Sequence, residues 1–420
     1  MKKIAAVLAA AAFFSLPAAG TVKAIRFGKV WDGHKSITNA VVIVAGDKVQ
    51  SVTENGKVPA GAEVIDLRHY TGIPGMIDAH THVTYYWGGE PNTTPRRQPR
   101  RAVAVTVYLS QANGKKALEA GTTTLRDLNA AGGADLAMRD LINMGAMVGP
   151  RLFVSSTGLR SYKGQPGVTD PLAEAAKRTK AVIDDGADWV KVFGSTGGFD
   201  NVTMDQTVSY EEMKTIVDTA HSMGHKVAIH SYGPDGARDA IRANTDSLEH
   251  ATDMDDATIA ELIRKKIYYV PTIDHNQYYV ENADDVYKFP PEAKGNLKDY
   301  IERNYQTAKK VFAAGGGDHM VVGSDAVYNG FGLNMRELTW FVKMGMTNEQ
   351  AMATATTIPA AMLGMEGKLG VVAPGSFADI VAVEGDPLKN INAAASAKNV
   401  KWVMKGGAVV VDKRAAKATH

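Results

Sequence analysis

Residues 74–82 read PGMIDAHTH, a short apolar run that ends in two histidines. In an extended chain, side chains two positions apart point to the same side, so His80 and His82 can both face one metal ion. A His-x-His pair alone is weak evidence, because 11 histidines are spread over the chain. However, the pair stands at the end of an apolar strand, and other predicted strands also end in polar residues.

Apolar strands alternate with amphipathic helices across the middle of the chain, which is the pattern of βα units around a parallel sheet. Eight strands are predicted, at residues 73–77, 122–127, 152–155, 189–193, 227–230, 247–250, 268–271 and 321–324. Eight βα units over about 300 residues are typical of a (β/α)8 TIM barrel, an α/β fold whose active site lies at the carboxyl ends of the strands.

Short strands separated by turns occupy both ends of the chain, without long helices between them. The sequence therefore predicts a small composite β-sandwich, formed by residues 21–71 and 369–420. The TIM-barrel catalytic domain, predicted at residues 72–368, is inserted between these two segments.

Residues 1–20 have the features of a secretory signal peptide. Two lysines precede an apolar run that ends at Leu16, and small residues at Ala18 and Gly20 fit cleavage before Thr21. The run is shorter than the roughly 20 residues of a membrane span, and no other stretch is apolar enough to cross a bilayer. We expect an exported protein, periplasmic or extracellular, without a membrane span.

The composition excludes several classes of function. Lys and Arg number 47 against 45 Asp and Glu, a formal net charge of +2, so no global positive field favours nucleic acid as a partner. The 420 residues are 45% hydrophobic and 22% charged, which suits a globular protein with a large core. The chain contains no cysteine, which excludes disulfides, thiolate ligands and a cysteine nucleophile.

Polar residues also end other predicted strands. His230 ends the fifth strand, His250 ends the sixth, and Asp325 follows the eighth. Because the carboxyl ends of barrel strands meet at one face, we expect these side chains to lie near His80 and His82. Imidazole and carboxylate groups are usual ligands of Zn2+ in proteins.

Lys191 lies in the middle of the apolar fourth strand, WVKVF. Burying an ammonium group is costly, and burial lowers the pKa of an amine. A neutral amine can add CO2 to form a carbamate, an anion that can bridge two divalent cations. A lone strand lysine more often reaches solvent or pairs with a carboxylate, but four strand-end histidines and an aspartate favour the carbamate here.

These segments resemble the metal-dependent amidohydrolase superfamily over nearly the whole mature chain. The matching segments are residues 74–82, Lys191, His230 with Tyr232-Gly233, Glu249-His250, residues 323–326 and residues 375–379. Within the superfamily the chain is most similar to a secreted, prolidase-like and imidazolonepropionase-related branch. That branch cleaves dipeptides and N-acyl amino acids, and it includes Xaa-Pro hydrolases and ochratoxin-degrading amidohydrolases.

The resemblance implies a binuclear centre with two divalent metal ions, expected to be Zn2+, in which hydroxide bound to metal attacks an amide carbonyl. It implies that one ion is held by His80, His82 and Asp325, that the other is held by His230 and His250, and that N6-carboxylated Lys191 bridges them. Such a centre carries about one net positive charge before substrate arrives, which favours substrates with a carboxylate.

Two residues have predicted catalytic roles. Asp325 is the expected proton shuttle, which takes the hydroxide proton and passes it to the leaving amine. Tyr232, two positions beyond His230, can donate a hydrogen bond to the developing oxyanion. Ordinary loop packing explains Tyr232 equally well.

Candidate substrate contacts flank the first, third and seventh strands. His275 follows the seventh strand, and Tyr85, Trp87 and Tyr278 can form an apolar wall for bulky or aromatic groups. Gln165 stands where many members of the branch have the histidine of a Gly-Gly-His segment, so the specificity of the branch does not transfer directly. The arginine-rich segment after Trp87 is expected to be a substrate lid or a subunit contact.

Two other functions stay open. A mononuclear deaminase of cyclic amidines, related to imidazolonepropionase, needs one metal ion, and a carbamate at Lys191 has no bridging role there. A non-catalytic barrel scaffold is expected to lose ligands, whereas all six ligand positions are filled here. We therefore expect a homo-oligomeric hydrolase that acts on a small amide or dipeptide.

Overall fold

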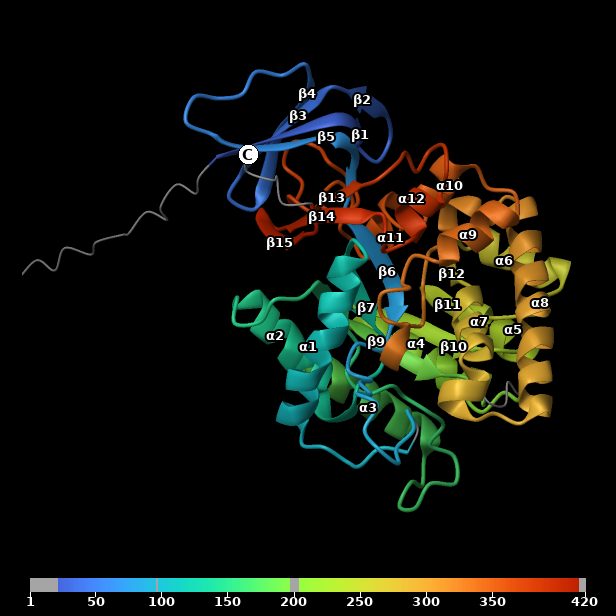
Figure 1. Cartoon of the computed structure of the whole chain (residues 1–420). Coiled ribbons are helices and arrows are strands. Elements are labelled where there is room, and N and C mark those ends of the chain that lie inside the picture. The colour runs from blue at the N-terminus through green and yellow to red at the C-terminus, as the bar shows by residue number, and fades with distance from the viewer. Residues whose placement is uncertain (1–21, 96, 197–203, 415–420) are drawn as a thin grey trace, which may run out of the picture.

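The computed structural model describes residues 22–95, 97–196 and 204–414. One eight-stranded sheet lies at one end of the molecule, and a larger body of parallel strands and helices lies beside it (Figure 1). The predicted signal peptide, residues 1–20, lies outside the described residues.

The eight-stranded sheet combines strands from both ends of the chain in the order β15-β14-β13-β5-β1-β3-β4, with β2 paired to β1. Its strands are β1 (Lys23–Trp31), β2 (Ser36–Thr38), β3 (Ala40–Ala45), β4 (Lys48–Glu54), β5 (Glu63–Pro74), β13 (Ile380–Val383), β14 (Val400–Lys405) and β15 (Ala408–Asp412). β5 pairs antiparallel with β13, with Ile73 opposite Val381. The predicted joint origin of this sheet is therefore confirmed, while its division into the two layers of a sandwich stays a prediction.

Apolar side chains fill the interior of this terminal sheet. Phe27, Leu67 and Trp402 are fully or almost fully buried in one cluster with valine and isoleucine neighbours. Successive strand residues point to opposite faces, so alternate positions supply this cluster. The sheet is stabilised mainly by removal of apolar surface from water.

The α/β body contains seven parallel strands in two sheets, of order β6-β7-β8 and β12-β11-β10-β9. The strands are β6 (Met76–Thr81), β7 (Thr122–Asp127), β8 (Arg151–Val154), β9 (Trp189–Phe193), β10 (Lys226–Ser231), β11 (Ser247–His250) and β12 (Tyr268–Val270). Seven of the eight predicted strands are thus confirmed, three of them with the predicted bounds.

The boundary predicted for the first of these strands is wrong. Ile73 and Pro74 belong to β5 of the terminal sheet, and β6 begins only after Gly75. A Cβ atom at Gly75 would overlap Thr123, so only glycine allows the chain to pass this close from one sheet to the next.

The predicted eighth strand, residues 321–324, is not a strand in the structure. The amide of Val321 donates to the carbonyl of Tyr269 at 3.0 Å, and the amide of Ala79 donates to the carbonyl of Val322 at 2.9 Å. The segment therefore lies between β12 and β6. Regular pairing stops because the Ser324 amide donates to the carboxylate of Asp78 instead of to a neighbouring strand. Closure as a regular eight-stranded barrel stays a prediction.

Helices follow the strands and cover the α/β body (Figure 1). They are α1 (Val103–Glu119), α2 (Ala134–Asn143), α3 (Pro171–Asp184), α4 (Tyr210–Ser222), α5 (Pro234–Arg242), α6 (Asp256–Arg264), α7 (Ile273–Glu281), α8 (Pro291–Ala313), α9 (Glu337–Lys343), α10 (Asn348–Ala353), α11 (Thr357–Met362) and α12 (Asn392–Ala395). Their starts follow local sequence: Asp170 caps α3, and Ser209 with Glu212 forms a capping box on α4.

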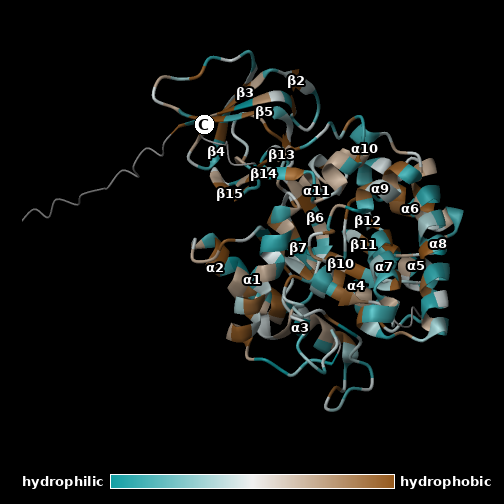
Figure 2. Ribbon diagram, in the orientation of Figure 1, coloured by the Kyte–Doolittle hydropathy of each residue, from teal (hydrophilic) through white to brown (hydrophobic). Residues whose placement is uncertain are grey.

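The outer sides of these helices face water. Figure 2 shows hydrophilic residues along much of α8, at the outside of the molecule. Within the described ranges, no helix combines the length and hydropathy needed to cross a bilayer.

Candidate metal centre

The six predicted ligands come together at the carboxyl ends of the strands. His80 belongs to β6, Lys191 to β9, His230 to β10 and His250 to β11, while His82 and Asp325 follow strand segments directly. All six are buried. The fold therefore places four imidazoles, one amine and one carboxylate in one water-excluded region.

Asp325 lies between three histidines. Its Oδ1 is 3.1 Å from Nε2 of His82 and 3.7 Å from Nε2 of His80. Its Oδ2 is 3.2 Å from Nε2 of His275. Burial opposes ionisation of this carboxyl, but the three imidazoles outweigh burial and hold the pKa of Asp325 well below its usual range.

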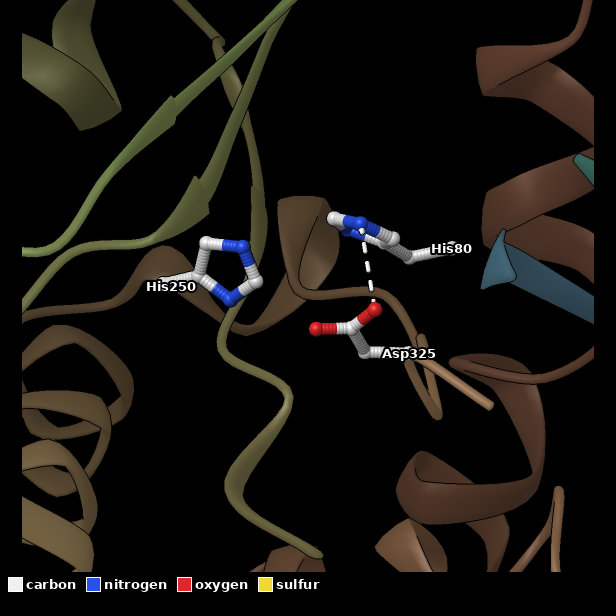
Figure 3. A group of neighbouring side chains, drawn as sticks. All are labelled: His80, His250 and Asp325. Atoms are coloured by element: carbon white, nitrogen blue, oxygen red, sulfur yellow. Dashed lines mark ion pairs between the residues drawn. The ribbon is translucent and has the colours of Figure 1, made fainter. Parts of the chain in front are cut away.

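Three of these residues can offer atoms to a single metal ion. One ligand atom each from His80, His250 and Asp325 lies within 4.8 Å of the other two, and Figure 3 shows the side chains gathered around a common space. The ring of His230 is 4.4 Å from that of His250, centroid to centroid. This group includes members of both predicted subsites, so the two subsites adjoin.

Three of the four imidazoles, those of His80, His230 and His250, are held in their neutral form. Burial lowers the pKa of His80 to about 4, and it lowers the pKa values of His230 and His250 far below the ordinary 6.5. A neutral imidazole keeps a lone pair for a metal ion. The donor set therefore suits a divalent cation at neutral pH.

Lys191 buries an unpaired amine in this region. It is 1% exposed, and its Nζ has no hydrogen-bond partner in the described part of the chain. Burial lowers the pKa of its amine to about 8. An amine buried without a partner destabilises a fold, so Nζ is well suited to chemical modification or to a bound ion. His82 presents a second such atom, Nδ1.

Glu249, a residue that sequence analysis leaves without a role, orients His80. Its Oε2 lies 2.8 Å from Nδ1 of His80, and its Oε1 accepts a hydrogen bond from Arg126 at 2.9 Å. Burial raises the pKa of Glu249, but Arg126 and His80 outweigh burial and lower it to about 2. An ionised Glu249 keeps the proton of His80 on Nδ1 and turns Nε2 toward the site.

Glu249 is a charged residue inside a short predicted strand, as Lys191 is, although only Leu248 in its strand is apolar. Asp78 in β6 is charged as well. The carboxylate of Asp78 accepts hydrogen bonds from the Ser324 amide at 2.9 Å and from Asn334 at 2.8 Å. These bonds hold the turn that presents Asp325.

Backbone strain gathers at the same place. His250, Thr272 and Asp325 have φ values of +70°, +52° and +47°, in the left-handed region that residues other than glycine rarely adopt. Each such residue costs about 1–3 kcal/mol and persists where its surroundings require it. At His250 one contact with the surroundings comes from Thr272, whose Oγ1 lies 2.7 Å from Nδ1 of His250.

Tyr232 and His275 both reach the centre. The ring of Tyr232 stacks on His250 at 4.8 Å and meets His230 edge-on at 4.7 Å. Burial raises the pKa of Tyr232, which keeps its hydroxyl protonated and able to donate. His275 contacts Asp325 directly, so the structure places it beside the candidate ligands, and its role toward substrate stays a prediction.

The other predicted substrate residues have unequal positions. Tyr85 stacks on His82 at 4.6 Å, and Tyr278 lines a small cavity with His275 and Asp325. Trp87 instead donates to Thr93 of its own loop at 2.9 Å.

Gln165 is exposed, and its side-chain amide donates to the carbonyl of Ser161 at 2.6 Å. Both of these residues belong to the loop that follows β8, so the observed contact of Gln165 is internal to its loop. Its role toward substrate stays a prediction.

Buried histidines, an aspartate and a lysine at the strand ends of a parallel α/β body define the class of metal-dependent hydrolases with a TIM-barrel type of fold. Residues 71–410 match the model of the Amidohydrolase family. The chain therefore belongs to the amidohydrolase family, and the resemblance predicted from its motifs is confirmed.

Relatives and solved structures agree with this assignment. The ochratoxinase of Aspergillus niger is 29% identical over 373 residues, which cover 80% of this chain and 74% of the relative. An imidazolonepropionase of Streptomyces avermitilis is 24% identical over 373 residues, which cover 83% of this chain and 81% of the relative. A solved Xaa-Pro dipeptidase with methionine bound in its active site has a TM-score of 0.82 and 26% identity, and covers 93% of this chain and 99% of its own.

Proposed function

We propose that the protein is a binuclear, zinc-dependent hydrolase that cleaves the amide bond of dipeptides or N-acyl amino acids. The observation that carries this proposal is the buried Nζ of Lys191, which has no hydrogen-bond partner in the described residues and lies close enough to His80, His230 and His250 to lower their pKa values. A carbamate on Nζ would supply two anionic oxygens at a place where the protein otherwise buries an unpaired amine.

The donor set fits two divalent ions. His80, His82 and Asp325 would hold one ion, and His230 and His250 would hold the other, with carboxylated Lys191 shared between them. Bound divalent ions activate water as a nucleophile at neutral pH and polarise a carbonyl group. Neutral imidazoles and an ionised Asp325 match this demand without any change of protonation.

Asp325 is proposed to move the proton during hydrolysis. Its carboxylate oxygens are ionised and face the centre, so they can take a proton from the attacking water and deliver it to the leaving nitrogen. The protonated hydroxyl of Tyr232, whose ring lies against both His230 and His250, is proposed to donate to the oxygen of the scissile carbonyl.

An amino acid is the proposed leaving group. The relatives and structural neighbours include an ochratoxinase and a Xaa-Pro dipeptidase, which supports an amide substrate with an amino acid on one side. Tyr85 and Tyr278 lie beside His82 and Asp325, where they can pack against an aromatic or bulky group.

The test combines metal analysis with a hydrolysis screen over N-acyl amino acids and dipeptides, ochratoxin-like amides included. We expect close to two divalent ions per chain and release of free amino acid. Active protein with one ion per chain, or release of ammonia from cyclic amidines without release of amino acid, would favour the mononuclear deaminase that the imidazolonepropionase relative suggests. Absence of any turnover with two bound ions would favour a non-catalytic barrel.

Export and assembly are further parts of the proposal. The sequence features of residues 1–20 support cleavage before Thr21 and a periplasmic or extracellular enzyme. Mass spectrometry of protein from its native host is expected to find Thr21 at the mature N-terminus, and intact Met1 in the cytoplasm would contradict export. We also propose that the protein is a homo-oligomer. Its fold is proposed to combine a closed barrel at residues 72–368 with a sandwich of the terminal segments.

A further inference from the structure

Arg160 lies at the same end of the strands as the metal centre. Its neighbour Leu159 forms a parallel bridge with Val192 of β9, and the amide of Phe193 donates to the carbonyl of Leu159 at 2.9 Å. The loop after β8 thus runs alongside the last residues of β9. Arg160 is therefore level with the carboxyl end of the strand that carries Lys191.

One aromatic ring links Arg160 to the centre. The guanidinium carbon of Arg160 lies 4.2 Å from the centroid of the Phe193 ring, and Nζ of Lys191 lies 5.2 Å from the same centroid. The ring of Phe193 also meets His230 edge-on at 5.6 Å. The distance from the guanidinium to Nζ of Lys191 therefore cannot exceed the sum of the first two distances.

The side chain of Arg160 is exposed. Its guanidinium has no acidic partner in the described part of the chain. Some other exposed arginines pair with a near neighbour in sequence, as Arg178 does with Glu174 and Arg242 does with Asp239. An always-charged, planar group held on an aromatic ring beside a catalytic centre is well suited to bind an anion.

We propose that Arg160 binds the α-carboxylate of the amino acid that leaves during hydrolysis. This inference rests on the proposed function and identifies its substrates as amides with a free carboxylate. The three bonds from the scissile carbonyl carbon to the carboxylate carbon sum to only about 4.3 Å. A guanidinium within reach of Lys191 can thus contact the carboxylate while the carbonyl lies at the centre, with two parallel hydrogen bonds.

Arg160 lies in the same loop as Gln165, a residue predicted to contact substrate. Gln165 in that loop is neutral and donates to Ser161, so it offers no charge to a carboxylate. Arg160, five positions earlier, is the loop residue that contacts Phe193 of the site.

The experiment compares N-acetyl-L-phenylalanine with N-acetyl-L-phenylalaninamide, in which the carboxylate is replaced by a neutral amide. Acetate release is measured for the wild type, Arg160→Gln and Arg160→Lys. We expect the wild type to prefer the acid, and Arg160→Gln to lower kcat/KM for the acid about 10- to 100-fold. The loss is expected mainly in KM, because binding is weakened without change at the reacting atoms. Arg160→Lys should recover part of it.

The matched control is Arg242→Gln, which removes another exposed guanidinium that lies 4.1 Å above an aromatic ring, that of Tyr210. It should leave both substrates unaffected. Calorimetric binding of the same two compounds provides a second measurement that does not depend on turnover. If neither compound is hydrolysed, the proposed function fails for this substrate class, and selective binding of the acid that is lost in Arg160→Gln still supports the anion site. An acid-to-amide ratio that is the same in Arg160→Gln and wild type, in kinetics or in binding, would overturn the proposal.

Discussion

The terminal sheet and the carboxyl ends of the α/β strands bury side chains of opposite chemistry. The interior of the terminal sheet is apolar, with Phe27, Leu67 and Trp402 as large members. The strand ends bury charged and polar groups instead, among them Lys191 and Glu249. Both regions exclude water to a similar degree, so the difference lies in what is buried.

This difference separates stability from function. Burial of apolar surface stabilises a fold by about 25 cal/mol per Å2, whereas an unpaired buried polar group destabilises it by about 1–3 kcal/mol. The terminal sheet therefore contributes to folding, and the strand ends hold reactive groups that folding alone does not favour. Loss of a residue from either region should change one property and spare the other.

The largest expected effect is that of Lys191→Ala on turnover. Loss of the bridging group should abolish hydrolysis, with partial recovery by short carboxylic acids that can occupy its place. The unfolding free energy of the metal-free protein should stay equal or rise, because an unpaired buried amine is removed. Activity assays with added acetate or propionate, together with urea unfolding, check both expectations.

Lys226→Ala is the matched control for this change, since Lys226 also lies in a strand of the body but donates to the carbonyl of Met362. It should retain activity. Full activity in Lys191→Ala would falsify the bridging role.

The second largest effect on turnover is expected for Asp325→Asn. Removal of the proton shuttle is expected to reduce kcat by about 10²- to 10⁴-fold, while near-ultraviolet circular dichroism stays that of the wild type. Asp318→Asn, at an exposed position, serves as control. Turnover within a factor of two of the wild type would exclude Asp325 as the shuttle.

Trp402→Ala tests the contribution of the terminal sheet to stability. Truncation of this fully buried side chain should lower the unfolding free energy by about 3–5 kcal/mol. The kcat of the folded protein should remain unchanged, because the terminal sheet supplies none of the proposed ligands. Val409→Ala, on the exposed side of β15, should change stability little. A large loss of kcat in fully folded Trp402→Ala would show that the terminal sheet and the strand ends are coupled.

Glu249→Gln should weaken the metal centre less than loss of a ligand. Outer partners of ligand histidines typically contribute 10- to 100-fold in metal affinity, so metal competition titrations should show a loss of this order. Glu366→Gln, at an exposed position, is the control. Unaltered metal affinity would mean that Arg126 and Glu249 serve folding alone.

The smallest expected effect is a pH dependence of the metal-free protein. The folded pKa of His80 is about 4, below its ordinary value of 6.5. Between these values the unfolded state binds more protons than the folded state, so stability should fall as pH falls through this window. Urea unfolding in excess chelator at pH 7 and pH 5 measures this change. His80→Gln should reduce this dependence without removing it, because burial also lowers the pKa values of His230 and His250. An equal pH dependence in that variant would assign the effect to other groups.

The sequence predicted much of this molecule from local pattern. Apolar runs located seven parallel strands, and polar residues at or near strand ends, together with Lys191 inside its strand, identified the six clustered candidate ligands. This works because a barrel-type fold brings all strand ends to one face, so position within a strand already implies position in space. The strand predicted at residues 321–324 is not regular in the structure, since the side chain of Asp78 competes for the amide of Ser324, and local pattern does not reveal this contact.

Local sequence pattern did not predict which residues contact the candidate ligands. Glu249 and Asp78 were visible as charged residues within or directly after predicted strands, but their contacts with His80 and Ser324 join segments far apart in the chain. The same holds for Arg160, whose position beside Phe193 depends on the path of the loop after β8. Gln165 drew attention by its place in a motif, yet its observed contact is with Ser161 of its own loop.

The sequence by itself determined which residue types stand at the strand ends, and with them the family and the class of chemistry. Periodic burial and the chemical character of single side chains are local properties, so they can be read along the chain. The tertiary structure alone decided which buried groups meet, which imidazole nitrogen faces the centre, and which cation lies beside it. Those outcomes depend on distances between strands, which are set only when the whole core packs.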